Sequence, residues 1–283
     1  MALLPDGRPR RYVNCEGEPD YDFILPRPGS RPGVSAMVRV RNEAAKLAHA
    51  LRSILALFDE IVVVDNGSDD GTPAVVRGLQ QTNPLGDRIT LWSYPFRLAR
   101  FGPDHAATPA DSLHSAVYFS NWSLGRCSHR YVCKWDGDMV VAREARPAFT
   151  ALLHRVRRGR FGCWTLAGQT VYRAADGTWY LAVGEVNREV ELFPNGWGYR
   201  FKKRPHWEGL SRPSLPRKRH FEPVAFFELK DVAEDEFGHW STTAWPSQRK
   251  RREWSNFHAV KAGELDPGRF QALGPSFLDD QVG

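Results

Sequence analysis

The sharpest chemical signal in the sequence is a pair of carboxylates separated by one glycine, Asp136-Gly137-Asp138. The pair directly follows a β-prone run at residues 131–135 (YVCKW), so both carboxylates lie at the mouth of an expected strand. Carboxylate oxygens are hard ligands that suit Mg²⁺ or Mn²⁺, and the oxygens of a diphosphate can complete the shell of such an ion. The pattern indicates a divalent-cation site, although a solvated acidic turn has the same sequence.

A further carboxylate, Asp65, follows the apolar run at residues 61–64 (IVVV) and begins a loop dense in turn residues, 65–71 (DNGSDDG). A carboxylate in this position can accept a hydrogen bond from an N–H group of a nucleotide base. The small residues Asn66 and Gly67 would let the nucleotide approach the backbone. The same residues also suit a loop that caps the next helix, and the sequence leaves both interpretations open.

Strands and helices alternate along the part of the chain that carries these carboxylates. Apolar runs of strand character alternate with segments of helical spacing, which predicts a doubly wound, mostly parallel α/β sheet. Ligands bind such sheets beyond the carboxyl ends of the strands, where Asp65 and Asp136 are expected to lie. The predicted strands are residues 34–40, 61–64, 88–94 and 131–135, and the predicted helices include 111–124 and 147–156.

The pattern changes near residue 160, after which short aromatic runs and turns prevail. Asp176-Gly177, between residues 162–173 and 179–183, predicts a β-hairpin. We therefore expect one continuous domain with three parts. These are an extended lead-in at 1–32, an α/β half at 33–160, and an appended mixed β and aromatic C-terminal region at 161–283.

Two segments, 34–43 (VSAMVRVRNE) and 61–72 (IVVVDNGSDDGT), resemble the opening of the family 2 glycosyltransferases of the GT-A fold. In that family one strand ends in N-E and the next in D-N-G-S-x-D-x-T. Residues 134–139 (KWDGDM) resemble its metal-binding D-x-D motif, and the resemblance covers residues 34–145. It implies a GT-A-like fold and an inverting transfer of a sugar from a nucleoside-diphosphate donor, as in the branch that makes bacterial cell-envelope glycans.

The resemblance also implies roles for individual residues. Asp136 and Asp138 would hold the metal, and Arg100 could pair with a donor phosphate, although a surface salt bridge suits Arg100 equally. The donor-binding residues that it implies are Val40, Arg41, Asn42 and Glu43 in the first loop, Asp65, Asn66 and Gly67 near the base, and Lys134, Trp135, Asp136 and Gly137 near the diphosphate.

Such a transfer needs a general base, because the acceptor hydroxyl loses its proton as it attacks. The acidic pair typical of many family members is not evident downstream. We predict Glu208 as the base, with Glu189 and Glu191 as alternatives. His206 shares a strand face with Glu208 and could be a third metal ligand or a phosphate contact, although both residues also suit a surface loop.

Composition and charge exclude several classes of protein. No apolar run approaches the about 20 residues of a membrane helix, and the N-terminus lacks the apolar segment of a signal peptide, so we expect a cytoplasmic protein. The four cysteines form no C-x-x-C pair, which argues against zinc. The net charge of +6 is spread over short clusters, which does not favour nucleic acid but allows peripheral contact with an anionic membrane at its inner face.

The leading interpretation is a metal-dependent glycosyltransferase that uses Mg²⁺ or Mn²⁺ and a nucleotide-sugar donor, with a UDP-sugar the commonest in the family. The acceptor would be a glycan, a lipid-linked molecule or a small molecule. A nucleotidyltransferase of similar fold is an alternative, but residues 41–46 (RNEAAK) are not the basic, glycine-rich loop of those enzymes. A catalytically silent nucleotide- or carbohydrate-binding module is the other, and the intact Asp136 and Asp138 argue against it.

Overall fold

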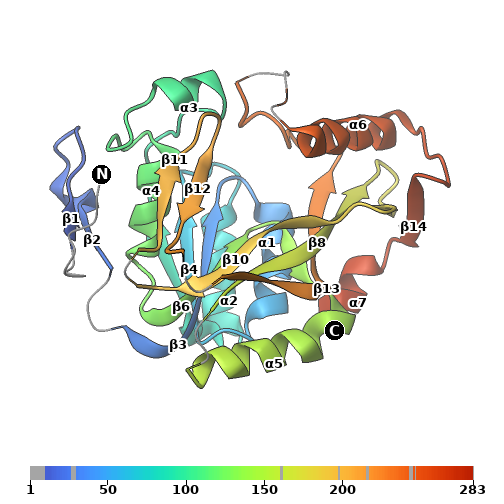
Figure 1. The fold of residues 1–283 in the computed structure, drawn as a ribbon. Helices are drawn as coiled ribbons and strands as arrows, with labels where there is room; N and C mark the ends of the chain where they lie inside the picture. The colour runs from blue at the N-terminus through green and yellow to red at the C-terminus, as the bar shows by residue number, and fades with distance from the viewer. Residues whose placement is uncertain are drawn as a thin grey trace.

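Ten strands form one mixed sheet in the computed structural model of the chain, which describes residues 10–26, 30–159, 162–196, 198–214, 217–241, 245 and 247–282 (Figure 1). Four neighbouring strands of this sheet are parallel. Residues 33–38 of β3 and 61–65 of β4 are buried on both faces, which is why the run at 61–64 (IVVV) is apolar instead of alternating. In spatial order, the four are β6 (His129–Asp136), β3 (Arg31–Val40), β4 (Glu60–Asp65) and β5 (Ile89–Ser93).

Helices cover both faces of the parallel strands. The apolar sides of α1 (Ala44–Ile54), α2 (Thr72–Thr82) and α5 (Arg146–Arg157) pack in one core cluster with the odd-numbered residues of β4. Helix α4 (Ala116–Leu124) packs on the opposite face, together with aromatic residues next to a hairpin of β11 (Arg200–Lys203) and β12 (Glu208–Ser211). The helix predicted at 111–124 begins later, at Ala116, because Ser115 caps it there: the Ser115 side chain accepts a hydrogen bond from the Val117 N–H.

The C-terminal strands extend the same sheet. β10 pairs antiparallel with β6 and with β8, and β8, β9 and β14 continue the sheet outward. β13 lies parallel to β8 and antiparallel to β7. The bounds are β7 (Met139–Val141), β8 (Cys163–Arg173), β9 (Trp179–Ala182), β10 (Asn187–Pro194), β13 (Lys218–Asp231) and β14 (Phe270–Gly274), with helices α3 (Pro103–Ala107), α6 (Gln248–Ala262) and α7 (Phe277–Val282).

The predicted α/β class and the hairpin around Asp176-Gly177 are confirmed, since β8 and β9 are antiparallel neighbours. The C-terminal region differs from an appended unit because its strands join the same sheet. The described part of the lead-in is also more regular than expected, with a ladder of β1 (Arg10–Tyr12) and β2 (Phe23–Leu25); residues 1–9 lie outside the described residues.

No helix in the described residues is both long enough and apolar enough to span a membrane.

The close packing of β8 on β13 gives a test of this core. A Cβ on Gly168 would lie 2.2 Å from two ring atoms of Phe226, whose side chain is fully buried. Gly168→Ala should therefore destabilise the protein by about 1–3 kcal/mol in urea unfolding. Gly78→Ala is the control, because the site on α2 is open and alanine favours a helix by about 1 kcal/mol. Unchanged stability of Gly168→Ala would show that the Phe226 ring is free to move.

Candidate functional site

The sheet register places the two predicted acidic positions on either side of one strand end. In β3, Arg39 is the partner of Asp136 in β6, and Val40 is the partner of Asp65 in β4. Two strand spacings therefore separate Asp65 from Asp136, a distance of about 10 Å across the sheet. Both carboxylates lie at the carboxyl end of the parallel strands, as the sequence pattern predicts.

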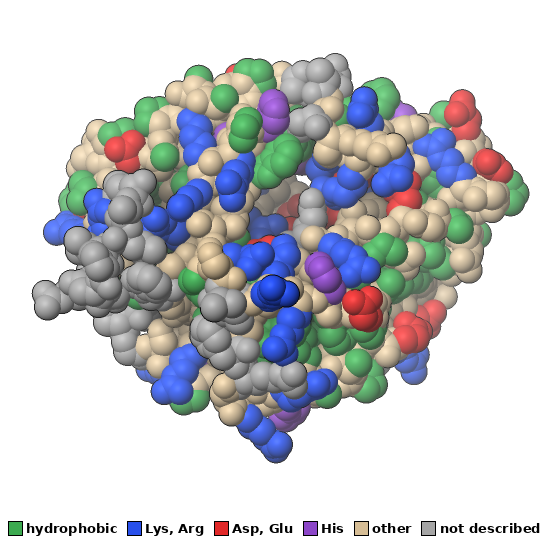
Figure 2. All heavy atoms as spheres, viewed as in Figure 1, with side chains coloured by type: hydrophobic (Ala, Val, Ile, Leu, Met, Phe, Trp, Pro, Cys, Tyr) green, Lys and Arg blue, Asp and Glu red, His purple; other side chains and the backbone are tan. Residues whose placement is uncertain are grey.

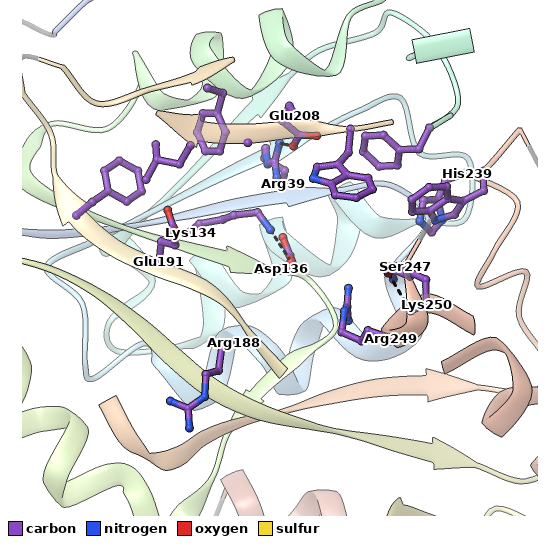
Figure 3. A pocket seen from close by; sticks show the side chains of 17 residues that line it. Arg39, Lys134, Asp136, Arg188, Glu191, Glu208, His239, Ser247, Arg249 and Lys250 are labelled. Carbon is purple, nitrogen blue, oxygen red and sulfur yellow. Dashed lines mark hydrogen bonds and ion pairs between the residues drawn. The ribbon is translucent and has the colours of Figure 1, made fainter. Parts of the chain in front are cut away.

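A cavity of about 570 Å³ opens beside Asp136. Residues of β3, β6, β10, β12 and the start of α6 line it, among them Arg39, Lys134 and Asp136 (Figure 3). These three share a face because Arg39 pairs with Asp136 and because Lys134 lies two residues before Asp136 in the same strand. Figure 2 shows this face of the molecule hollowed, with lysine and arginine side chains around the hollow.

Asp136 is the predicted residue that faces this cavity most directly. Its side chain is 31% exposed and lies 3.0 Å from the Lys134 ammonium. Burial acts to raise the pKa of Asp136, but Lys134 and Arg39 outweigh it and lower that pKa, so the carboxylate is ionised at neutral pH. The neighbouring Trp135 instead faces the core, where its indole N–H donates to the Met139 carbonyl at 3.0 Å.

Asp138 points away from the cavity into a group of buried charges. Its carboxylate accepts a hydrogen bond from the Lys230 ammonium at 2.8 Å, and the same ammonium lies 2.9 Å from Glu228 and 3.4 Å from Glu236. Burial raises the pKa of Asp138 to about 6, against the opposing effect of Lys230. We call these residues, together with two on the loop and helix after β3, the buried ion cluster: Glu43, Lys46, Asp138, Glu228, Lys230 and Glu236.

The loop after β3 is fixed by this cluster and by the loop after β4. Lys46 lies 3.3 Å from Glu43 and 2.7 Å from Glu236, and burial together with the Asp138 charge raises the pKa of Glu43 to about 8. Asn42 has a positive φ of 54°, and its side-chain oxygen accepts a hydrogen bond from the Asp69 N–H at 3.0 Å. Of the other residues predicted in this loop, Val40 is buried and Arg41 is exposed.

Asp65 lies at a second, smaller cavity of about 320 Å³, which Arg77 and Trp92 also line. Its side chain is 6% exposed; Oδ2 accepts a long hydrogen bond from the Ser68 N–H at 3.3 Å. The other oxygen, Oδ1, is buried and has no hydrogen-bond partner among the described residues. Asn66 is committed to structure, because its amide donates to the Tyr94 and Phe96 carbonyls. A buried carboxylate oxygen without a partner is costly unless a ligand donates to it.

Two of the predicted bases line the large cavity. Glu208 accepts hydrogen bonds from Arg39 at 2.9 Å and from Ser120 at 3.2 Å, and its side chain is 8% exposed. Glu191 contacts Lys218 through Oε1 at 2.9 Å, while its Oε2 is buried without a hydrogen-bond partner among the described residues. Glu189 lies in β10, but its side chain is outside the described part of the structure.

Comparison with known proteins gives a match over the part of the chain that contains the loops after β3 and β4. Residues 35–98 match the model of glycosyl transferase family 2. The matched segment contains Asp65 and both of these loops. An uncharacterized glycosyltransferase of Rickettsia felis is 41% identical over 46 residues, which is 16% of this chain and 16% of that protein, so the chain spans about one sixth of this curated relative.

Two solved structures resemble the chain more distantly. Glucosyl-3-phosphoglycerate synthase from Mycobacterium tuberculosis, in complex with Mn²⁺, UDP and glucosyl-3-phosphoglycerate, is 20% identical, with a TM-score of 0.31 over 51% of this chain and 46% of that one. TarS of S. aureus is 11% identical, with a TM-score of 0.39 over 69% of this chain and 60% of that one.

The structure does not bring the three predicted metal ligands, Asp136, Asp138 and His206, into one group. Among the described residues, no set of three or more His, Cys, Asp and Glu side chains is arranged to hold a metal ion. His206 lies in the β11–β12 turn, where its carbonyl accepts from the Gly102 N–H, and Asp138 is engaged by Lys230. Asp136 alone of the three lines the cavity. One carboxylate with substrate phosphates is a common way to bind Mg²⁺, so Asp136 fits a donor-bound cation.

Several other residues have contacts in the structure that differ from the roles predicted from the sequence. Arg100 forms an exposed pair with Asp104 at 3.3 Å and does not line the cavity. Gly137 is required sterically, since a Cβ there would lie 2.6 Å from Val40 Cγ1. Sequence reasoning missed Arg39, for which the one available signal was a charge near the end of the apolar run at 34–40. It also missed Arg188, Trp240, Arg249 and Lys250.

Lys230 gives a test of the buried ion cluster. Lys230→Met would leave Asp138, Glu228 and Glu236 without the ammonium between them, and breaking such a buried pair costs about 3–5 kcal/mol. Urea unfolding should show this loss, and Lys230→Arg should recover part of it. Arg173→Met is the matched control on the neighbouring strand, because Arg173 is half exposed beside Asp231 and such pairs contribute about 1 kcal/mol or less. A loss below 1 kcal/mol for Lys230→Met would contradict the assignment.

Proposed function

We propose that the protein is an inverting glycosyltransferase that binds a nucleoside-diphosphate sugar along the strand ends between Asp65 and Asp136. The observation that carries the proposal is the unpartnered, buried Asp65 Oδ1, which lies within the segment that matches the glycosyltransferase family. A base N–H donated to this oxygen would satisfy it. Uracil, thymine and guanine have such a ring N–H next to a carbonyl, and among their nucleotides we propose a UDP-sugar.

The diphosphate of the donor would then lie at Asp136, in the large cavity. Arg39 and Lys134 lie on this wall beside the carboxylates of Glu208 and Asp136, and Asp136 would hold Mg²⁺ or Mn²⁺ together with phosphate oxygens. When bound, the cation neutralises the charge that develops on the leaving diphosphate. The predicted contribution of Asp138 is less direct, because that carboxylate binds Lys230 and so fixes the turn that presents Asp136.

The acceptor would enter through the same cavity, whose wall includes Phe101, Trp207 and Trp240. Aromatic faces of this kind suit sugar rings, which supports a glycan, lipid-linked or small-molecule acceptor, and we propose a role in cell-envelope glycan synthesis at the cytoplasmic side. The basic side chains around the hollow face suit peripheral contact with an anionic membrane.

We propose Glu191 as the general base, ahead of Glu208. Both carboxylates line the cavity, but Glu208 already accepts hydrogen bonds from Arg39 and Ser120. Glu191 has one oxygen without a hydrogen-bond partner among the described residues. It lies on the same sheet face as Asp136, because the next residue, Leu192, pairs with Cys133. Its free oxygen can accept the proton that the attacking hydroxyl loses.

Nucleotide binding tests the donor site. UDP, dTDP, GDP, CDP and ADP are added separately with Mn²⁺, with Mg²⁺ or with chelator, and thermal unfolding is measured. A nucleotide at 100 times its Kd should stabilise the protein by about 2.7 kcal/mol. We expect UDP with metal to give the largest shift, and Asp65→Asn to weaken UDP binding by about 10-fold or more, because a hydrogen bond to a charged group contributes about 1.5–3 kcal/mol.

Asp69→Asn is the control for this experiment, since it changes the same charge in the same loop and Asp69 does not line the Asp65 cavity. Asp136→Asn should remove the effect of metal while leaving base selectivity intact. If no nucleotide shifts the unfolding temperature, the donor-site proposal is wrong and a different ligand must be sought.

The general base is tested by turnover. Glu191→Gln should keep UDP affinity within about twofold and lower kcat for sugar transfer or donor hydrolysis by about 10²–10⁴-fold. Glu208→Gln should act mainly through stability, since it leaves Arg39 buried without its carboxylate. Wild-type kcat in Glu191→Gln, with loss of kcat in a folded Glu208→Gln, would assign the role to Glu208 instead.

A further inference from the structure

The beginning of α6 forms one wall of the large cavity, opposite the parallel strands. Ser247, Arg249 and Lys250 line the cavity there, and the Ser247 hydroxyl caps the helix by accepting the Lys250 N–H at 3.2 Å (Figure 3). The N-terminus of this 15-residue helix carries the positive end of its dipole. The helix end therefore adds to the charge of the two basic side chains.

These two cations are fixed at the wall by one buried carboxylate. Glu253, one turn further along α6, is 4% exposed and lies 3.1 Å from Arg249 and 3.0 Å from Lys250. Glu253 thus contacts both cations, and Arg188 of β10 lines the same cavity. The positive charge of this wall also acts on the imidazole of His239. Burial is the main cause that lowers the pKa of His239 to about 4, and the charges of Lys250 and Lys230 lower it further.

The same cavity is also lined by a residue whose hydrogen-bond donor has no acceptor in the described part of the chain. Trp240 lines the cavity and is 7% exposed, and its indole Nε1 is buried with no hydrogen-bond partner in the described part of the chain. The ring is held in place by Phe101 and by Trp207, at centroid distances of 5.4 and 6.4 Å. A buried N–H without an acceptor is costly, and an anion would satisfy it.

From the helix end, the two fixed cations and the unpartnered indole N–H, we propose that this wall is a second anion subsite, which binds a phosphate or carboxylate group of the acceptor. The proposal rests on the proposed function, because the donor diphosphate is assigned to Asp136 and the strand ends. The protein would then select an acidic acceptor, and the aromatic rings next to the subsite would contact the uncharged part of that molecule.

The test is a calorimetric titration of inorganic phosphate into protein saturated with UDP and Mg²⁺, with malonate in a parallel arm to distinguish a phosphorylated from a carboxylated acceptor. Arg249→Gln/Lys250→Gln should weaken binding of the preferred anion at least 10-fold and change UDP affinity less than twofold. Arg251→Gln/Arg252→Gln is the matched control, because both residues are exposed on the same helix. It should change neither affinity.

Trp240→Phe is the second variant, since it removes the indole N–H and leaves the charges, and it decides the question if the double variant does not fold. It should weaken anion binding several-fold. The proposal is overturned if neither anion binds the UDP-saturated protein, if the control pair weakens binding equally, or if Arg249→Gln/Lys250→Gln weakens UDP binding 10-fold, which would assign these cations to the donor. If no nucleotide binds, the donor-site proposal fails, and the same titration on nucleotide-free protein still tests the anion subsite.

Discussion

The ammonium group of Lys230 is the point on which the arrangement of the candidate site depends. It is buried between Asp138, Glu228 and Glu236, and an ammonium in such a place is tolerated only because these carboxylates surround it. Through Asp138 it fixes the turn after β6, and through Glu236, which also contacts Lys46, it fixes the start of α1. Removing this one charge would leave Asp138 and Glu228 without the ammonium between them, and Glu236 with Lys46 alone.

The contact between Lys230 and Asp138 gives different surroundings to two carboxylates, Asp136 and Asp138, that look equivalent in the sequence. Asp136 is the last residue of β6 and takes the face of the sheet shared with Lys134, while Asp138 follows a tight turn and faces the buried ion cluster. Gly137 permits the turn, because Val40 leaves no space for a side chain. One aspartate is thus accessible to a ligand, and the other holds the backbone that presents it.

Local patterns in the sequence are sufficient to predict where Asp65 and Asp136 lie in the fold. Each follows an apolar strand, and parallel strands collect their carboxyl ends at one edge, so the α/β half could be predicted with its acidic loops. Lys230 could not, because its contact with Asp138 spans 92 residues and depends on how β13 pairs with β7 and β8. The Arg39–Glu208 pair spans 169 residues and depends on the β11–β12 hairpin folding back over the sheet, for which periodicity gives no signal.

The cavity has two walls that differ in how their cations are paired with carboxylates. On the strand side each cation has a carboxylate beside it, Arg39 with Glu208 and Lys134 with Asp136, so this wall is close to neutral and can accept an anion together with a divalent cation. On the α6 side Arg249 and Lys250 both contact Glu253, and the positive end of the helix dipole adds to their charge. A donor that arrives with its own metal ion suits the first wall, and an anion without one suits the second. Charge balance, more than cavity shape, is therefore the physical basis on which two substrates could be kept in their separate places.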